Sequence, residues 1–247
     1  MENCSNSRKL FSEIRITLNT KMRYFITIFL LIYFIGKSTA QDTYLLGTLP
    51  SINLNKGINS NWSLNLKAES RLRFLQGDFG GEAQSDLNLQ LADFALSASR
   101  KTGLNNTLAG GYLIRLRGEQ TFHRFFQQFT MVKRYETFRM AHRFSSDQTF
   151  NSDNPWELRL RYRITVEIPL NGQSVDPGEF YLKLNNEYLN SWQEGEPDLE
   201  IRLVPLAGYE FTDNNKLEFG LDYRLSSFID GNSRNSFWLN IGWYLKI

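Results

Sequence analysis

The segment from Trp156 to Leu170, WELRLRYRITVEIPL, alternates between apolar and polar residues. Even-numbered positions from 158 to 168 are Leu, Leu, Tyr, Ile, Val and Ile, whereas odd-numbered positions from 157 to 167 are Glu, Arg, Arg, Arg, Thr and Glu. Successive side chains of an extended strand point to opposite faces. The segment is therefore predicted to form a strand with one apolar face and one face that carries three consecutive arginines.

The same alternation recurs along the chain and predicts a succession of strands. It is clearest in NWSLNLKAESRLRF (61–74) and KLEFGLDYRLSSF (216–228), and weaker in TLAGGYLIRLR (107–117) and EFYLKLNNEYL (179–189). Turn-rich pieces separate these runs, and no stretch after residue 40 has a convincing helical period. Alternating segments of about ten residues, separated by turns, are the sequence sign of a transmembrane β-barrel.

The pattern predicts an all-β, antiparallel, up-and-down transmembrane barrel of 10–12 strands with a charged lumen. Because bacterial single-chain barrels have an even number of strands, we expect the ten strands from Asn61 onward to close by themselves. The first segment, TYLLGTLPSINL, would then fold inward, lie across the periplasmic mouth, or be one of twelve strands of which one is not recognised, and Pro50 argues against a central strand there. The predicted strands begin near Thr43, Asn61, Asp86, Thr107, Phe122, Thr137, Trp156, Glu179, Leu199, Lys216 and Ser236.

The final segment, SFWLNIGWYLKI, is the most specific of the predicted strands. Outer-membrane barrels typically end in such an apolar strand, which the barrel-assembly machinery recognises. With the C-terminus in the periplasm, strand parity places NGQSVDPGE and TDNN in periplasmic turns, and SSDQTFNSDNP and DGNSRN in outer loops. The residues of the assembly strand that are expected to face lipid are Phe237, Leu239, Ile241, Trp243, Leu245 and Ile247.

A secreted, lipocalin-like barrel is the alternative fold, because its strands also alternate, with the apolar face turned inward. Three features favour the membrane barrel. The strands, at about ten to fifteen residues, are long enough to cross a bilayer at a tilt of about 45°. The chain ends in an apolar strand, and aromatic residues lie near strand ends, as in interfacial girdles. These aromatics are Trp62, Trp156, Tyr188 and Phe228.

The polar faces of the strands carry carboxylates and guanidiniums. An arginine that faces lipid at mid-bilayer costs about 2–4 kcal/mol, so this face is expected to line the lumen. The charges would either pair and fill the interior, since a barrel of this size leaves only a narrow gap, or line a selective pore. The candidate lumen residues are Glu69, Arg71, Arg73, Arg115, Arg117, Glu157, Arg159, Arg161, Arg163, Glu187, Glu200, Arg202, Glu218, Asp222 and Arg224.

Residues 1–40 contain the layout of a secretory signal peptide. Basic residues precede an apolar run (24–35), and three small residues end at Ala40. This run is shorter than the ~20 residues that a membrane-spanning helix needs. We therefore expect cleavage after Ala40 and one barrel domain over residues 41–247. The residues before Met22 would be an upstream extension, with Met22 as a candidate translation start.

Charge and cysteine content narrow the possible functions. Of 28 basic and 26 acidic residues, six and two lie before residue 41, which leaves residues 41–247 with a net charge of −2. This balance gives no indication of nucleic-acid binding. The one cysteine, Cys4, lies in the expected leader, so residues 41–247 cannot form disulfides or thiolate metal sites. No cofactor is expected.

The chain resembles an uncharacterised family of Gram-negative outer-membrane barrels, domain of unknown function 2490. The matching pieces are HRFFQQF (123–129), AHRF (141–144), LRLRYRITVEIPL (158–170), NNEYLN (185–190), IRLVPLAGYEF (201–211) and LEFGLDYR (217–224). The likeness runs from about Asn61 to the end and implies fold and location, but no activity. After Arg143 the family tends to continue with more arginine and a glutamate, whereas Ser145, Asp147 and Thr149 stand here. This departure is expected to reduce the number of charged side chains that face the lumen.

The two histidines, His123 and His142, are the candidate catalytic bases. Outer-membrane phospholipases use a Ser-His-Asn set, and omptin-type proteases use Asp and His. Neither pattern is found, and no G-x-S-x-G motif is present. Two histidines without thiolates do not supply the three or four ligands of a zinc site. We therefore expect no enzyme and no metal, with both histidines hydrogen-bonded in the lumen or at its rim.

The favoured function is a structural or partner-binding outer-membrane barrel whose lumen is filled by side chains. A narrow passive pore for small solutes is the alternative, and an outer-membrane hydrolase is a weaker second alternative. The expected partners are outer-membrane lipid and the barrel-assembly machinery. The sequence names no solute and no other partner.

Overall fold

The computed structural model describes residues 42–229 and 231–247, and the expected leader lies outside this range. All regular secondary-structure elements in the described residues are β-strands. None of these residues forms a helix long and apolar enough to cross a membrane. The strands are β1 (Thr43–Gly57), β2 (Trp62–Asp78), β3 (Ala83–Lys101), β4 (Asn106–Arg117), β5 (Gln120–Arg134), β6 (Arg139–Phe150), β7 (Glu157–Pro169), β8 (Glu179–Gln193), β9 (Glu196–Thr212), β10 (Asn215–Ser226) and β11 (Arg234–Lys246).

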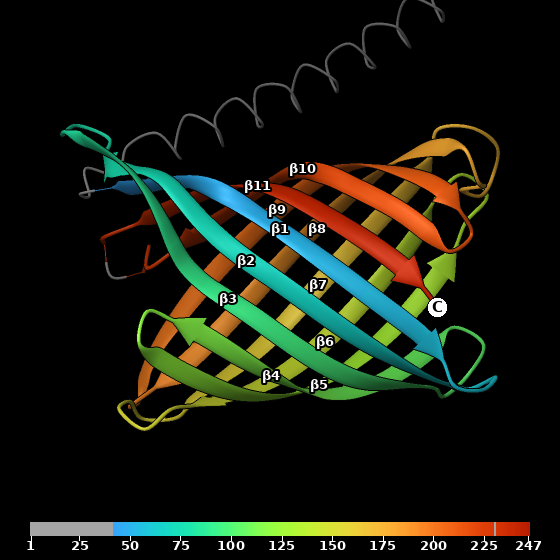
Figure 1. Cartoon of the computed structure of the whole chain (residues 1–247), viewed down its shortest axis with the longest axis horizontal. Coiled ribbons are helices and arrows are strands. Elements are labelled where there is room, and N and C mark those ends of the chain that lie inside the picture. The colour runs from blue at the N-terminus through green and yellow to red at the C-terminus, as the bar shows by residue number, and fades with distance from the viewer. Residues whose placement is uncertain (1–41, 230) are drawn as a thin grey trace, which may run out of the picture. The chain divides into compact units, whose positions relative to one another are not determined.

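The eleven strands close into one barrel (Figure 1). Strands that follow one another in the chain pair antiparallel, and β1 closes the barrel by pairing in parallel with β11. A meander with an odd number of strands must close in this way, because its first and last strands run in the same direction. The expectation of an even strand number, with ten strands closing from Asn61 onward, was wrong.

The first strand is a full member of the wall despite Pro50. It pairs with β11 over thirteen consecutive residues, from Thr43 to Asn55. Its ladder with β2 continues on both sides of a gap at Leu49 and Pro50. A proline lacks the backbone N–H that would donate a hydrogen bond to a neighbouring strand. The pairing of β1 with β11 nevertheless continues through Pro50. The argument from Pro50 against a central strand was therefore also wrong.

The other strands begin within three residues of their predicted starts. The prediction for one polar run was wrong. SSDQTFNSDNP was predicted as a loop, but Ser145–Phe150 forms the second half of β6 and only residues 151–156 connect β6 to β7. The serine, aspartate and threonine of this run alternate in burial, with Ser145, Asp147 and Thr149 buried. They therefore belong to a strand whose polar side chains point inward.

The two ends of the barrel are distinct and serve as reference points below. Ile247 follows β11 at the C-terminal end, together with the β7–β8 and β9–β10 connections that carry NGQSVDPGE and TDNN. Asp42 precedes β1 at the opposite, N-terminal end, where the β6–β7 and β10–β11 connections also lie. The predicted grouping of these loops into two sets agrees with this topology.

The exterior of the barrel is apolar on every strand. Large hydrophobic side chains project outward with more than a third of their surface exposed, whereas charged side chains on the same strands are buried in the interior. These exposed side chains include Leu46, Ile52, Leu64, Leu66, Phe94, Leu96, Leu108, Leu116, Phe125, Phe144, Leu160, Ile168, Leu182, Leu184, Leu203, Phe219, Leu221, Leu239 and Trp243.

Three interior aromatic rings are seated on glycines of the neighbouring strand. Tyr181 lies directly opposite Gly208, Phe126 opposite Gly111, and Trp238 opposite Gly47. A Cβ added at any of these glycines would overlap ring atoms. The absent side chains make room for rings inside the barrel, a pairing known to stabilise sheets.

We expect Gly208→Ala to destabilise the barrel, because its methyl group would collide with the Tyr181 ring. Overpacking of this kind costs about 1–3 kcal/mol. Urea-induced unfolding of the purified protein, followed by tryptophan fluorescence, measures the change in the free energy of unfolding. Gly57→Ala is the matched control, because a Cβ there meets nothing within 4 Å. Equal stability of the two variants would show that the ring is not confined by the glycine.

Candidate functional site in the lumen

The lumen holds a central cavity of about 1180 Å³ that is lined mainly by charged and polar side chains. Twelve of the fifteen predicted lumen residues line it. Arg73, Arg117 and Glu157 do not. Arg73 and Glu157 lie toward the N-terminal end of the barrel, where they contact Asp86 and Arg159 respectively. Arg117 is exposed at the end of β4.

The cavity opens at the C-terminal end of the barrel. Its lining includes residues 135, 136, 173–175, 213 and 214, which lie in the three connections β5–β6, β7–β8 and β9–β10. Among the described residues, none of the connections at the N-terminal end contributes to the lining. The cavity is therefore a vestibule that is accessible from one side.

Three buried apolar side chains lie beyond the inner limit of the vestibule: Leu91, Leu189 and Trp238. None of them lines the cavity. Each lies two positions nearer the N-terminal end than a residue that does, namely Asp93, Glu187 and Asn240. We call these three side chains the apolar floor.

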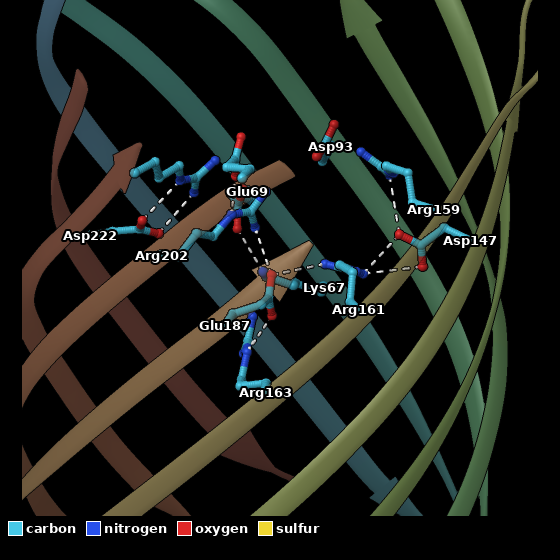
Figure 2. Close-up of polar contacts among 12 residues, drawn as sticks. Lys67, Glu69, Asp93, Asp147, Arg159, Arg161, Arg163, Glu187, Arg202 and Asp222 are labelled. Atoms are coloured by element: carbon cyan, nitrogen blue, oxygen red, sulfur yellow. Dashed lines mark hydrogen bonds and ion pairs between the residues drawn. The ribbon is translucent and has the colours of Figure 1, made fainter. Parts of the chain in front are cut away.

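A network of ion pairs centred on Asp147 and Glu187 links the inward faces of β6, β7, β8 and β9 (Figure 2). Asp147 is fully buried and its Oδ2 lies 3.2 Å from an Arg159 nitrogen and 3.0 Å from an Arg161 nitrogen. Glu187 is only 3% exposed and accepts from Arg163 at 2.6 Å. It also lies 3.1 Å from Arg202 and 3.6 Å from Arg161. Arg161 thus links the two carboxylates.

Further pairs satisfy the arginines at the edges of this network. Arg115 binds Asp93 through two hydrogen bonds of 2.8 and 2.7 Å. Arg224 binds Asp222 in the same two-pronged way, with both distances at 2.8 Å. Such paired bonds fix the geometry of a guanidinium as well as its charge. Two more carboxylates contribute: Glu69 contacts Lys67 and Arg71, and Glu200 contacts Arg202.

A second cluster lies closer to the C-terminal end and involves Glu218. This carboxylate is almost fully buried, accepts a hydrogen bond of 2.8 Å from the Tyr181 hydroxyl, and accepts two bonds of 2.7 and 2.8 Å from Lys183. The Lys183 ammonium also lies over the Tyr244 ring. Sequence reasoning identified Glu218 but not its partners.

Several charged members of the networks were missed from the sequence: Lys67, Asp93, Asp147 and Lys183. The departure from the family at Asp147 was expected to reduce the charge in the lumen. That expectation was wrong, because Asp147 forms ion pairs with both Arg159 and Arg161. The signal was present in the register. Asp147 lies two positions from Ser145 and four from Arg143, on the inward parity of β6, although the composition of this polar run is typical of a loop.

The two histidines lie on the exterior face, contrary to their expected place in the lumen or at its rim. His123 Nδ1 lies 2.5 Å from the Tyr112 hydroxyl, and His142 Nδ1 lies 2.8 Å from the Tyr162 hydroxyl. Each histidine also stacks with its tyrosine. Among residues 42–229 and 231–247, no three His, Cys, Asp or Glu side chains are grouped so as to hold a metal ion.

The residues of the predicted assembly strand share one face of β11 and its end. Leu239, Trp243 and Ile247 are exposed, and Phe237, Ile241 and Leu245 are half-buried. Leu245 also lies at the mouth of the cavity. The alternating residues Asn240 and Tyr244 point inward and line the cavity.

We expect Glu187→Gln to destabilise the barrel strongly. This isosteric change removes the charge that three guanidiniums share, and breaking a buried ion pair by removing one partner costs about 3–5 kcal/mol. Glu157→Gln is the matched control, because Glu157 is more exposed and its one ion pair, with Arg159, measures 3.8 Å. That loss should be about 1 kcal/mol or less. Urea unfolding of both variants measures the difference, and similar losses would contradict a central role for Glu187.

Comparison with known proteins gives one match. Searches of curated proteins and of solved structures found no match to this chain. The model of a family described as "Protein of unknown function (DUF2490)" matches residues 46–235. This match extends from β1 into β11 and includes nearly all of the described barrel. The chain belongs to this family, DUF2490.

Proposed function

We propose that the protein is an integral outer-membrane β-barrel of a Gram-negative bacterium, with a structural or binding role and a lumen that is closed to free passage. The polarity of the barrel carries this proposal. A barrel that stores an apolar ligand in water has an apolar interior and a polar exterior. The arrangement here is the reverse, with an exterior that is apolar on every strand and a charged interior.

The exterior fits the solvent that a bilayer provides. Apolar patches larger than a few hundred Å² are rare on soluble monomers and mark interaction surfaces. Exposed tryptophans lie toward both ends of the barrel, with Trp62 and Trp243 near the C-terminal end and Trp156 and Trp192 near the other. Membrane barrels carry such aromatic girdles on both sides of their apolar band.

The strand β7 illustrates the same division within one element. Leu160 is 46% exposed, while its neighbours Arg159 and Arg161 have side chains that are 11% and 20% exposed and are paired with carboxylates. Turning this strand over would place three arginines in the apolar layer. At about 2–4 kcal/mol for each arginine at mid-bilayer, the reverse register is excluded for a membrane barrel.

The interior favours a lumen that is closed at one end over an open pore. Only the connections of the C-terminal end contribute to the cavity lining, and the buried apolar side chains of the floor lie beyond its inner limit. A conducting pore needs a continuous path with sites that ions can enter and leave. Membership of DUF2490 supports the barrel but specifies no activity.

Leu160→Arg should prevent insertion, whereas Arg161→Leu should be inserted and only lose stability. The first variant places a charge in lipid, and the second removes one arm of the Asp147 and Glu187 network. Outer-membrane fractionation and heat-modifiable gel mobility measure the two outcomes. Recovery of the unaltered protein in the soluble periplasm would contradict the proposed location. Equal tolerance of both variants would contradict the assignment of the two faces.

The purified protein should give no steady current in planar lipid bilayers, since the vestibule ends at the apolar floor. A general porin measured in the same bilayer serves as the positive control. A steady current would favour the narrow-pore function instead. In that case Arg161→Leu should change the reversal potential in a salt gradient, because it removes a positive charge from a narrow lumen.

A further inference from the structure

The vestibule lies between two unlike walls. Small or uncharged side chains dominate the part of its lining that comes from β3 to β6, including Ala95, Ser97, Ala109, Thr130 and Ala141. The opposite part, from β7 to β10, carries most of the paired arginines and carboxylates. The small residues of the first wall leave room in the cavity beside the charged wall.

Arg143 is the unusual member of the first wall. It lines the cavity, and among the described residues no carboxylate lies within ion-pair distance of it. Its Nε is buried and has no hydrogen-bond partner. The Nε atoms of Arg71, Arg73, Arg159 and Arg161 share this state, but each of these four arginines has an ion pair with a carboxylate. A buried donor without a partner costs about 1–3 kcal/mol, and more when it is charged, so an arginine in this state indicates a partner that the chain does not itself supply.

The neighbours of Arg143 increase this demand for negative charge. Its register partners are Arg163 on β7 and Thr130 on β5. Directly opposed side chains lie about 4.5–5.5 Å apart at their Cβ atoms, and like charges in this position repel. Glu187, which pairs with Arg163, is shared with Arg161 and Arg202. One carboxylate therefore serves three guanidiniums, and none is left for Arg143.

The charge of the whole lining points the same way. Fifteen Lys or Arg residues but only ten Asp or Glu residues line the vestibule, and Asp147, just outside the lining, adds one carboxylate that pairs with Arg159 and Arg161. Residues 41–247 as a whole have a net charge of −2. Positive charge is thus concentrated around the cavity, where low-dielectric walls strengthen its field and attract anions.

We propose that Arg143 and Arg163 form a binding site for a small soluble oxyanion, a phosphate or carboxylate group, which enters through the C-terminal mouth of the vestibule. Guanidinium groups bind such anions through paired, charge-assisted hydrogen bonds. An anion between the two arginines would give the Arg143 Nε its missing acceptor and would relieve their mutual repulsion. The hydroxyl groups of Thr130 and Ser97 line the same cavity and suit a polar ligand.

The closed wall determines how the anion arrives. Every strand pairs with both neighbours, including β1 with β11, so no gap between strands admits a lipid headgroup from the side. Entry is through the mouth of the vestibule, which favours a soluble anion over a lipid. The proposal rests on this cavity and does not depend on the cellular location of the barrel.

Calorimetric titration of the purified, folded protein with inorganic phosphate at constant ionic strength tests the site. We expect saturable binding of one phosphate per barrel, and at least a tenfold weaker affinity in Arg143→Gln, since a hydrogen bond to a charged group is lost. Arg117→Gln is the matched control and should bind like the unaltered protein, because Arg117 is exposed on the strand end outside the cavity. Heat-modifiable gel mobility verifies that each variant is folded.

Thr130→Glu provides a second variant that keeps every arginine. It places a carboxylate directly opposite Arg143, which should raise stability and abolish phosphate binding together. Failure of the unaltered protein to bind phosphate saturably, or undiminished binding by Arg143→Gln or Thr130→Glu, would overturn the proposal. Competition by a short-chain phosphatidylglycerol would overturn the assignment to a soluble anion. These binding measurements do not depend on whether the barrel conducts ions or inserts into a membrane.

Discussion

The pairing of buried guanidiniums with buried carboxylates is the constraint on which this barrel depends. Arginine side chains are too large and too strongly charged to be left unpaired away from water. The interior meets this requirement by sharing, since Asp147 serves Arg159 and Arg161, and Glu187 serves three arginines. Because the charged residues occupy the inward face of the strands, the apolar residues of the same strands lie on the outward face. The ion pairs in the lumen and the hydrophobic exterior are therefore two results of one alternation.

Closure with an odd number of strands follows from the same alternation. Leu46 and Ile52 of β1 are exposed, and Leu49 and Ser51 are buried. The strand therefore has the two faces that the wall requires, and the parallel pairing with β11 leaves no open edge. An open edge would present unpaired backbone groups, which a bilayer does not satisfy. The interior rings of Tyr181, Phe126 and Trp238, which lie over glycines, fill further space inside the barrel.

Much of the fold could be predicted from the sequence, because period-two alternation directly encodes which face of a strand is buried. The site was less accessible. The arginines of β7 stand out as a run, but their partner Asp147 lies in a serine-rich stretch whose composition resembles a loop. The two-pronged bond between Arg115 and Asp93 joins residues 22 positions apart, and no local pattern specifies that register. The seating of Tyr181 on Gly208 is likewise a consequence of register, not of composition.

The contrast between Arg161 and Arg143 separates structural charges from binding charges in this lumen. Both side chains point inward from adjacent strands, but Arg161 contacts two carboxylates whereas Arg143 faces Thr130 and Arg163. A barrel that required only filling would gain by placing an acid or an apolar residue at position 143 or 130. Small residues on the same wall also keep open a cavity that larger ones would fill. An unpaired arginine beside space that the fold leaves vacant is therefore better explained by a ligand than by packing.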